Sequence, residues 1–492
     1  MSQQHMVIIG GGLAGLSTGC YALANGFKTT ILEHNLALGG VCTAWQRGPY
    51  TVDGCIQWLT GGPFLGIYRE LGIIPPVTVR PIQHFATYRN VRDGLEIDVT
   101  DDLEKLRQVL QRLSPADAHE VDRMIAGARA IAEMDPGLDT PPELATLRQR
   151  MSRLWDLREH VGDVAHFRHS VRDWGRSRLK SERLRRFVSH LAPEESPALV
   201  LLFMLGYLGR GWLSRPNGGT ARFRDALIAR YQALGGVTQV DTTVEEILVK
   251  SDRASGVRTT DGGIVDADVV VSTSSGPETV LRLLAGRYGA EETRLRLEKW
   301  KMFSPILLVS YGVDQPMSEV PGTLALDGLP PLQVGGRQDA GFTVRIFNDE
   351  PAVAPPGHTV VQVQAQTDYA FWATRGTGYG AAKEAAAATL LSSLEPVLPG
   401  LRQSVRMTDV ATPLTFWRNA RSWRGAFEGW LPTPESFFGH VDKTLPGLNA
   451  FYMAGQWVEP GGGVPTALLS GRHAVQIACN DIGRAFASPT GA

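Results

Sequence analysis

The first 33 residues combine two periods of apolar positions. Residues 7–9 are a short β-branched run, residues 13–25 carry apolar side chains at helical spacing, and residues 28–32 form a second β-branched run. Short β-branched runs are typical of strands, and a period near 3.6 residues is typical of a helix. The segment therefore predicts a strand, a helix and a second strand, which is the repeating unit of a parallel sheet.

Further along the chain, strand-like and helix-like stretches alternate. Short alternating runs between residues 85 and 99 predict a small antiparallel sheet. Residues 101–207 then follow helical spacing, with the clearest amphipathic faces at residues 102–113 and 118–134. Later strands and an alanine-rich helix are predicted at residues 307–313, 343–347, 359–364 and 381–398. This order predicts two domains whose segments interleave in sequence.

One helical stretch, residues 198–208, is apolar on every side. Such a helix is buried in a core, lines an apolar tunnel or touches lipid. The core and the tunnel both stay open as interpretations. Residues 416–424 mix aromatic side chains with arginine, and we interpret them as the wall of a pocket.

The composition narrows the classes of function. A chain of 492 residues is too long for one ordinary core, so two domains are the default. The net charge of −1 provides no basic field for nucleic acid. The four cysteines form no C-x-x-C pair, and His166 and His169 have no further ligand nearby in the pattern. We therefore predict no metal site and no nucleic-acid partner.

The sequence also bears on location. No apolar run approaches the roughly 18 residues that cross a bilayer. No charged and apolar leader pattern precedes the first predicted strand. We expect a cytoplasmic protein, with peripheral contact to a membrane left open and the oligomeric state not specified.

Glycines follow the first predicted strand at fixed spacing. Gly10, Gly12 and Gly15 form a G-x-G-x-x-G motif that opens the predicted helix, and Glu33 closes the second strand. Gly10 permits a tight turn, Gly12 lets the backbone approach a pyrophosphate, and Gly15 lets helix and strand pack closely. The pyrophosphate would lie on the N–H groups of the helix N-terminus, and Glu33 would accept hydrogen bonds from ribose hydroxyls. The segment predicts a dinucleotide-binding site.

Two later stretches indicate which dinucleotide is bound. A glycine-containing segment at residues 38–43 follows Glu33, and the chain ends with a strand-like run at residues 451–454 and a glycine turn at residues 461–463 that opens an apolar helical stretch. This split arrangement resembles the FAD-binding fold of the glutathione-reductase and amine-oxidase superfamily.

Four further segments, residues 215–220, 234–236, 244–247 and 266–270, carry a more specific likeness. On these segments the chain resembles the phytoene desaturase and retinol saturase group of that superfamily. The resemblance implies an α/β fold in which a doubly wound FAD-binding domain of the glutathione-reductase type interleaves with a substrate domain of mixed β-sheet and helices. The FAD-binding domain would comprise residues 1–76, 215–300 and 407–492, and the substrate domain residues 77–214 and 301–406.

The same resemblance implies one noncovalently bound FAD, because no histidine or cysteine lies in a recognised flavin-attachment motif. Val41 stands where many relatives carry arginine, so only backbone contacts are expected there, and Val244 would offer its backbone to adenine. Gln57 and Trp58, the candidate catalytic residues, would line the substrate side of the flavin; Gln57 is equally well explained as a satisfied polar residue in a loop. The predicted cofactor contacts are Gly10, Gly12, Leu13, Ala14, Gly15, Glu33, His34, Gly39, Gly40, Val41, Val244, Gly455, Gln456, Gly462, Gly463 and Val464.

The reaction class follows from the same resemblance. A flavin carries its own reactivity, so no catalytic triad is needed. We expect hydride transfer between a C–C bond of an extended apolar substrate, of carotenoid, isoprenoid or lipid type, and flavin N5. Desaturation is the first expectation, while saturation of a double bond and redox-neutral isomerisation use the same geometry. The substrate and the electron acceptor are not specified.

Two other functions on the same fold stay open. Amine and amino-acid oxidases commonly carry a lysine in the strand that faces flavin N5. The matching strand at residues 304–309 has no lysine, although Lys299 and Lys301 come just before it. A prenyl-lipid escort protein would share the architecture without flavin turnover, and the intact glycine motif with Glu33 argues against that function.

Overall fold

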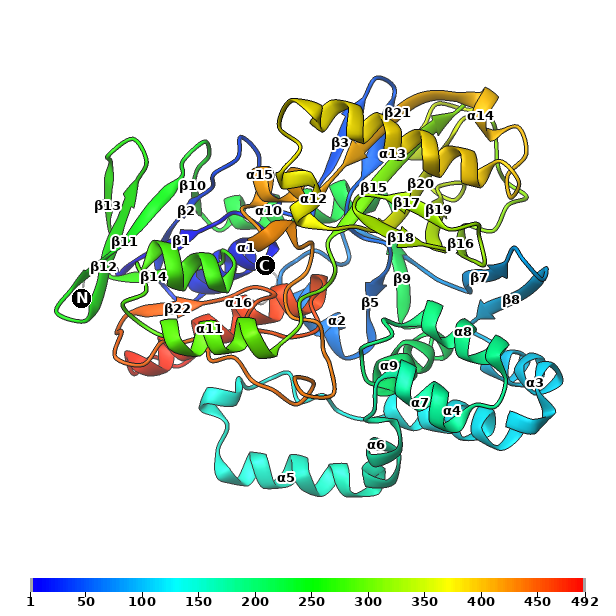
Figure 1. Cartoon of the computed structure of the whole chain (residues 1–492). Coiled ribbons are helices and arrows are strands. Elements are labelled where there is room, and N and C mark those ends of the chain that lie inside the picture. The colour runs from blue at the N-terminus through cyan, green and yellow to red at the C-terminus, as the bar shows by residue number, and fades with distance from the viewer. Residues whose placement is uncertain (1–2, 490–492) are drawn as a thin grey trace.

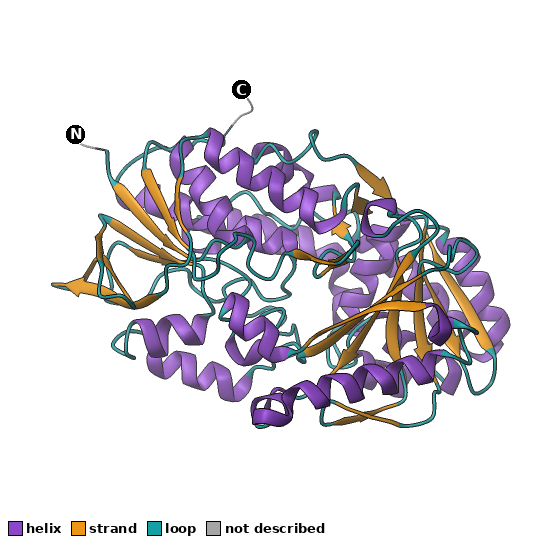
Figure 2. Cartoon of the chain, turned by 90° about the horizontal axis from the view of Figure 1, so that it is seen from above, coloured by secondary structure: helices purple, strands orange, loops and turns teal. Residues whose placement is uncertain are grey.

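The structure is a computed structural model that describes residues 3–489, apart from the side chains of residues 153, 154, 156 and 157. Two main sheets lie toward opposite ends of the molecule, with helices and loops between them (Figure 1 and Figure 2). The outermost residues of the predicted domains, 1–2 and 490–492, lie outside the described residues.

A five-stranded sheet forms one half of the molecule. Its strand order is β10-β2-β1-β14-β22, and every neighbouring pair is parallel. The strands are β1 (His5–Ile9), β2 (Lys28–Leu32), β10 (Val237–Gln239), β14 (Val269–Ser272) and β22 (Phe451–Met453). The predicted strand–helix–strand unit is confirmed, and the strand-like run near the C-terminus forms β22 in the same sheet.

Both faces of this sheet are covered. Met6 and Ile8 of β1 join an apolar cluster with helices α1 (Leu13–Ala24), α10 (Gly219–Ala233) and α16 (Val464–Asp481). Val7 and Ile9 point the other way and join a cluster that includes an antiparallel three-stranded sheet. That smaller sheet consists of β11 (Val244–Lys250), β12 (Arg253–Thr259) and β13 (Ile264–Asp266). Strands of a parallel sheet that is buried on both faces are apolar at nearly every position, as in β1 and β14.

A seven-stranded mixed sheet forms the other half, in the order β21-β15-β20-β19-β16-β7-β8. All neighbouring pairs are antiparallel except β16 with β7. Its strands are β7 (His84–Asn90), β8 (Leu95–Thr100), β15 (Ile306–Val313), β16 (Thr323–Asp327), β19 (Phe342–Ile346), β20 (Thr359–Gln366) and β21 (Val405–Ala411). The predicted alanine-rich helix is α13 (Tyr379–Leu394), whose Leu390 and Leu394 pack in the same cluster as Val309 and Val363.

Two expectations need correction here. The small antiparallel sheet predicted between residues 85 and 99 is only the edge hairpin of the seven-stranded sheet, because β7 also pairs with β16. The predicted domain boundary at residue 407 falls inside β21, which pairs with β15 from Val405 to Ala411. Neither pairing has a local sequence signal, since the partners are more than 90 residues apart.

A lobe of helices lies beside the seven-stranded sheet (Figure 1). The predicted amphipathic helices are α3 (Leu103–Leu113) and α4 (Ala118–Ile131), and α9 (Ala198–Gly209) is the stretch that is apolar on every side. A Cβ on Gly206 of α9 would lie 2.1 Å from the Ala128 carbonyl oxygen, so α9 packs directly on the backbone of α4. Most of α9 is core, while Val200, Phe203 and Met204 remain partly exposed.

The remaining elements connect these parts. The short sheet β5-β9-β6 joins segments from both predicted domains, and β3 pairs with β4. These strands and the outer hairpin are β3 (Ala44–Arg47), β4 (Tyr50–Asp53), β5 (Leu59–Thr60), β6 (Val79–Pro81), β9 (Leu213–Pro216), β17 (Leu332–Val334) and β18 (Arg337–Asp339). The other helices are α2 (Leu65–Glu70), α5 (Leu147–Leu157), α6 (Val161–Phe167), α7 (Val171–Arg178), α8 (Glu182–Leu191), α11 (Ala290–Lys299), α12 (Tyr369–Ala373), α14 (Leu401–Ser404) and α15 (Pro413–Ala420). Between residues 3 and 489, none of the helices combines the length and apolar character needed to span a membrane.

We predict that Gly15→Ala destabilises the protein. A Cβ at this position would lie 2.0 Å from the carbonyl oxygen of Gly10 and 3.1 Å from its carbonyl carbon, and this backbone cannot turn aside as a side chain could. Overpacking of this kind costs about 1–3 kcal/mol or more. Urea unfolding measures the loss.

Gly380→Ala is the matched control, because Gly380 is exposed in α13 and no atom lies within 4 Å of the added Cβ. It should leave the free energy of unfolding unchanged or raise it by about 0.5–1 kcal/mol. Equal free energies of unfolding for the two variants would show that the turn between β1 and α1 tolerates a side chain.

Candidate active site

The turn between β1 and α1 leaves only backbone around the start of the helix. Gly12 is the N-cap of α1, and no side chain caps the first turn. The Gly39 N–H donates to the carbonyl oxygen of Gly11 at 2.9 Å, and a Cβ on Gly12 would meet the Cα of Gly40 at 3.8 Å. The N–H groups that open α1 therefore face a space bounded by glycine backbone. Such a helix N-terminus favours an anion.

Glu33 comes directly after β2, beside this turn, and is buried. Its Oε2 accepts from the Gly11 N–H at 2.6 Å, and its Oε1 accepts from the Asn35 N–H at 2.8 Å. Burial raises the pKa of the carboxyl, while these two backbone donors lower it. A carboxylate has about four acceptor positions, so Glu33 can hold the glycine turn and still accept from a ribose hydroxyl.

Two neighbouring predicted contacts lie at the start of the antiparallel sheet. His34 Nδ1 lies 2.6 Å from the Thr243 hydroxyl, and its Nε2 lies 3.1 Å from the carbonyl oxygen of Arg418. Burial and then the positive charge of Arg421 lower the pKa of His34. His34 thus ties the end of β2 to the residue before Val244, which is buried at the start of β11. Val41, by contrast, is partly exposed.

The C-terminal glycine turn has a backbone that requires glycine. The φ angles of Gly461, Gly462 and Gly463 are +106°, +64° and +89°, a region that residues with a side chain rarely adopt. Gly463 is the N-cap of α16, again without a side-chain cap. The Gly455 N–H donates to the Ser470 hydroxyl at 2.7 Å, and the Gln456 amide donates to the Phe427 carbonyl at 3.3 Å. This turn provides a second helix N-terminus with free N–H groups.

The two helix starts belong to one packed unit. The Ser17 hydroxyl of α1 donates to the Leu468 carbonyl of α16 at 2.7 Å, and a Cβ on Gly471 would lie 2.7 Å from the Thr18 nitrogen. Two uncapped N-termini, glycine backbone around Gly12 and an acid at the end of β2 fit a dinucleotide with a pyrophosphate at its centre. The residues present therefore fit FAD.

The candidate catalytic residues lie in a segment that is bonded to residues 215–220, one of the segments that carry the family likeness. Asp53 accepts from the Thr220 N–H at 2.8 Å and from the Thr220 hydroxyl at 2.5 Å, which fixes residues 53–58 to the start of α10. The Gln57 amide donates to Gln362 Oε1 at 3.2 Å. Trp58 is 44% exposed and meets Phe85 edge-on with ring centroids 5.4 Å apart. The Gln57 side chain is thus hydrogen-bonded, and the Trp58 side chain is the more solvent-exposed of the two.

Lys299 and Lys301, the lysines that precede β15, are exposed, and Lys301 pairs with Glu195 at 2.5 Å. Every residue of β15 is buried, and none is a lysine. The sequence analysis missed a different lysine: Lys443 is fully buried, with its Nζ 2.7 Å from Glu459 Oε1. Nothing in the local pattern around Lys443 indicates this burial.

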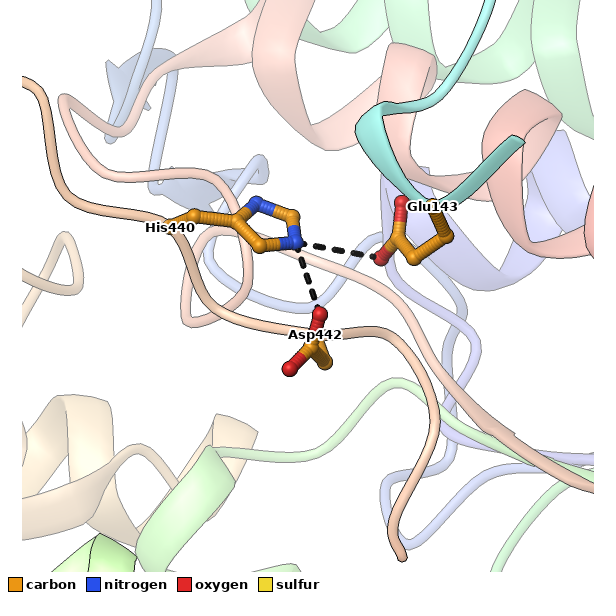
Figure 3. Close-up of side chains that lie close together, drawn as sticks. All are labelled: Glu143, His440 and Asp442. Carbon is orange, nitrogen blue, oxygen red and sulfur yellow. Dashed lines mark hydrogen bonds and ion pairs between the residues drawn. The ribbon is translucent and has the colours of Figure 1, made fainter. Parts of the chain in front are cut away.

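Two side chains of the C-terminal loop, His440 and Asp442, also meet Glu143, which is far away in sequence. His440 Nε2 lies 2.8 Å from Asp442 Oδ1 and 3.6 Å from Glu143 Oε1, and the three groups have the separation of a possible cation site (Figure 3). The backbone N–H of Lys443 donates to Glu143 at 2.9 Å, and its Nζ is 3.8 Å from the same carboxylate. Because this ammonium group already balances Glu143, we interpret the cluster as an ion-pair network that ties residues 142–144 to the C-terminal loop.

Glu428 is a further residue that the sequence analysis did not identify. A Cβ on Gly462 would lie 3.0 Å from the Cβ, Cγ and Cδ atoms of Glu428, so its side chain lies directly against the glycine turn. Burial raises the pKa of the Glu428 carboxyl to about 8. The signal in the sequence is slight: one acid in the otherwise uncharged stretch of residues 425–434.

The parallel sheet with two glycine-built helix starts defines an oxidoreductase of the glutathione-reductase type. Residues 13–479 match the flavin containing amine oxidoreductase family, and the chain belongs to that family. It is an FAD-dependent oxidoreductase. The fold class, the cofactor and the enzyme class predicted from the sequence are confirmed.

Individual relatives cover nearly the whole chain. A phytoene desaturase (lycopene-forming) of Pseudescherichia vulneris is 23% identical, over 97% of this chain and 99% of that protein. Among solved structures, an oxidoreductase from Methanosarcina mazei has a TM-score of 0.66 at 17% identity and covers 96% of this chain and 100% of its own. Wild-type putrescine oxidase bound to putrescine has a TM-score of 0.64 at 15% identity, with 98% and 99% covered. At these identities the solved structures establish the fold.

We predict that Gly463→Leu lowers the FAD content strongly while the fold survives. A Cβ on Gly463 meets only Pro465 at 3.8 Å, so the side chain would enter open space beside the helix start, and φ at +89° would strain the turn. Acid precipitation of the wild type should release one noncovalently bound FAD per chain into the supernatant, and the variant should release little.

Circular dichroism provides the folding control, and Gly48→Leu, at a positive-φ position with no atom within 4 Å and outside the site, controls for strain. Full FAD content in the Gly463 variant would show that the turn is only a helix cap. Flavin that stays with the precipitate would contradict noncovalent binding.

Proposed function

We propose that this protein desaturates an extended apolar substrate, of carotenoid or isoprenoid type, with FAD as hydride acceptor. The observation that carries the proposal is the likeness to phytoene desaturase over 97% of the chain. When bound, FAD would accept the hydride at its N5 position. The protein's own part is to bind the cofactor, orient the substrate and exclude water.

We assign the cofactor contacts as follows. The N–H groups of Gly12, Leu13 and Ala14 would bind the pyrophosphate, and Glu33 would accept from the ribose. The start of α16 at Gly463 and Val464 would place N–H groups at the flavin edge where charge accumulates on reduction. We further propose that the FAD-binding domain takes the three segments predicted from the sequence, with the last one beginning after Ala411, and that the two parts between them form the substrate domain.

An apolar surface supports the assignment of substrate class. Val200, Phe203 and Met204 of α9 are partly exposed and share one side of the helix, since they are spaced three and four residues apart. Other partly buried side chains of the same cluster are Phe64, Trp212 and Phe437. Burying apolar area is worth roughly 25 cal/mol per Å². This surface suits a long hydrocarbon and offers nothing to a small cation, whose desolvation would be uncompensated.

Oxidation of an amine is the second candidate, because putrescine oxidase shares the fold. Against it stand the buried, lysine-free strand β15 and the exposed positions of Lys299 and Lys301. Saturation and isomerisation of a double bond would use the same residues and differ only in the direction and balance of electrons. A prenyl-lipid escort role would leave the flavin without turnover.

We predict that Met204→Asp slows anaerobic flavin reduction by an apolar polyene roughly 10- to 100-fold, the equivalent of about 1–3 kcal/mol for placing a polar group against an apolar one. FAD content should not change. Leu295→Asp, at a position on α11 that is 43% exposed, is the matched control. Leu201 is unsuitable as a probe because it is 0% exposed, so that an aspartate there would unfold the lobe.

The same assay separates the two candidate functions. Stopped-flow reduction would be compared between apolar polyenes and simple amines. Rapid reduction by an amine, with no response to any polyene, would overturn the desaturase proposal in favour of amine oxidation. No reduction by either class, in a protein that holds FAD, would favour the escort role.

We also propose peripheral contact with a membrane, through helix α5. Leu147, Met151 and Trp155 are 77%, 57% and 65% exposed and recur every fourth residue, which places them on one side of the helix. Residues 147–158 contain four arginines and one acid. Figure 1 shows α5 at the lower edge of the molecule, outside the bundle formed by α3, α4 and α9. An exposed apolar stripe among basic residues fits the interface of an anionic bilayer.

We predict that the wild type sediments with vesicles of phosphatidylglycerol and phosphatidylcholine, and that the double variant Met151→Ser, Trp155→Ser loses at least half of this binding. Leu36→Ser is the control, since Leu36 is 74% exposed in the FAD-binding part. Binding should weaken at high salt, because the arginine contribution is screened. Equal binding by all variants would contradict a role for α5.

A further inference from the structure

The segment that carries Glu428 lies against the glycine turn at residues 461–463. The Gly461 N–H donates to the Trp430 carbonyl at 3.2 Å, and the Trp430 indole donates to the Trp457 carbonyl at 3.1 Å. A Cβ on Gly429 would lie 2.3 Å from the carbonyl oxygen of Gln456. On the other side of Glu428, the Gln456 amide donates to the Phe427 carbonyl. Residues 427–430 are therefore held against the loop that leads into α16.

Glu428 is partly exposed, and it differs from the other acids of this region in its partners. Glu33 and Asp53 accept from backbone N–H groups, and Glu459 pairs with Lys443 and His473. Glu428 forms no hydrogen bond or ion pair with any residue in the described part of the chain. Among the described residues, its carboxyl is therefore not engaged by another side chain or by the backbone.

The charged groups on the neighbouring segments do not explain the raised pKa of Glu428. Glu459, on the loop that leads to Gly461, is neutralised by Lys443 and His473. Arg424 is exposed, and Lys301, before the Phe303 ring that meets Phe427, pairs with Glu195. Burial alone raises the pKa of Glu428 to about 8, because the charged form loses its hydration.

We propose that Glu428 is the proton-transfer group of the active site, an inference that rests on the proposed function. In desaturation, one C–H bond breaks and its hydrogen leaves as a hydride to FAD. The adjacent C–H bond breaks with its electron pair forming the C=C bond, and its hydrogen leaves as a proton to the Glu428 carboxylate. The substrate is oxidised by two electrons and FAD is reduced, and the proton is later released to solvent.

The pH dependence follows from this role. A base must be ionised, and the ionised fraction of Glu428 rises as pH rises through about 8. Flavin reduction by substrate should therefore accelerate from pH 6 to pH 9, with an inflection at about 8. The ionisation should also perturb the bound flavin without substrate, because a negative charge then appears beside the turn that holds it.

The test compares Glu428→Gln, Glu428→Asp and a control, Glu435→Gln, whose carboxyl is exposed seven residues further on. The visible spectrum of the bound flavin would be titrated from pH 6 to pH 10. We expect an inflection near pH 8 in the wild type and in the control, a shifted one in the aspartate variant and none in the glutamine variant. Anaerobic flavin reduction by a polyene should slow roughly 10²- to 10⁴-fold in the glutamine variant.

The outcomes separate this inference from the proposed function. A glutamine variant with full FAD content, an unchanged spectral inflection and an unchanged reduction rate would overturn the role of Glu428 alone. A wild-type protein that holds FAD and is reduced by amines only would overturn the desaturase function instead. If the glutamine variant does not fold, the aspartate variant decides: an inflection identical to that of the wild type would overturn the inference.

Discussion

The close approach of helix α1 to the turn before it is the constraint on which the site depends. Gly15 lies against the carbonyl of Gly10 with no room for a Cβ, which brings the uncapped helix start to the end of β1. On its other side, α1 crosses α16 at Gly471, and the Ser17 hydroxyl reaches the Leu468 carbonyl. The position of α16, and with it the second uncapped helix start, therefore follows from the packing of α1. The close contacts at Gly15 and Gly471 thus bring the starts of α1 and α16, which are far apart in sequence, into one packed unit.

The parts of the fold that the sequence predicted are those whose signal is local. The first strand–helix–strand unit and the amphipathic helices of the lobe show a clear period within a dozen residues, and the structure has their ends no more than three residues from the expected ones. The seven-stranded sheet was only partly predicted, because it assembles strands from residues 84–100, 306–366 and 405–411. No local pattern says that β7 lies parallel to β16 or that β21 joins β15. Long-range pairing of this kind is decided by which apolar faces remain to be covered.

The same division applies to the candidate site. Glycines at positive φ or in close backbone contact can be recognised, because residue type and spacing encode the backbone shape directly. Glu428 and Lys443 could not be recognised in this way. Both are ordinary charged residues in the sequence. Lys443 becomes buried only when segments far away, such as residues 142–144, cover the C-terminal loop. Glu428 stays partly exposed, and its contact with the glycine turn arises only in the folded chain. For buried charges, the sequence gives the chemistry and the tertiary structure gives the environment.

Glu459 and Glu428 lie in the same region, and their surroundings shift their pKa values in opposite directions. Although burial raises the pKa of Glu459, His473 and Lys443 lower it to about 2, so its contribution to stability is present above the ordinary carboxyl pKa of 4.5 and is lost as pH falls through about 2. Glu428 has its pKa raised to about 8, so the folded state is favoured by this group below pH 4.5 and loses that contribution as pH rises through about 8. At neutral pH, Glu459 is therefore ionised and structural, while Glu428 is mostly protonated and can still change its charge. Acids driven apart in this way have different roles, and the one that still titrates near neutrality is the one suited to moving a proton.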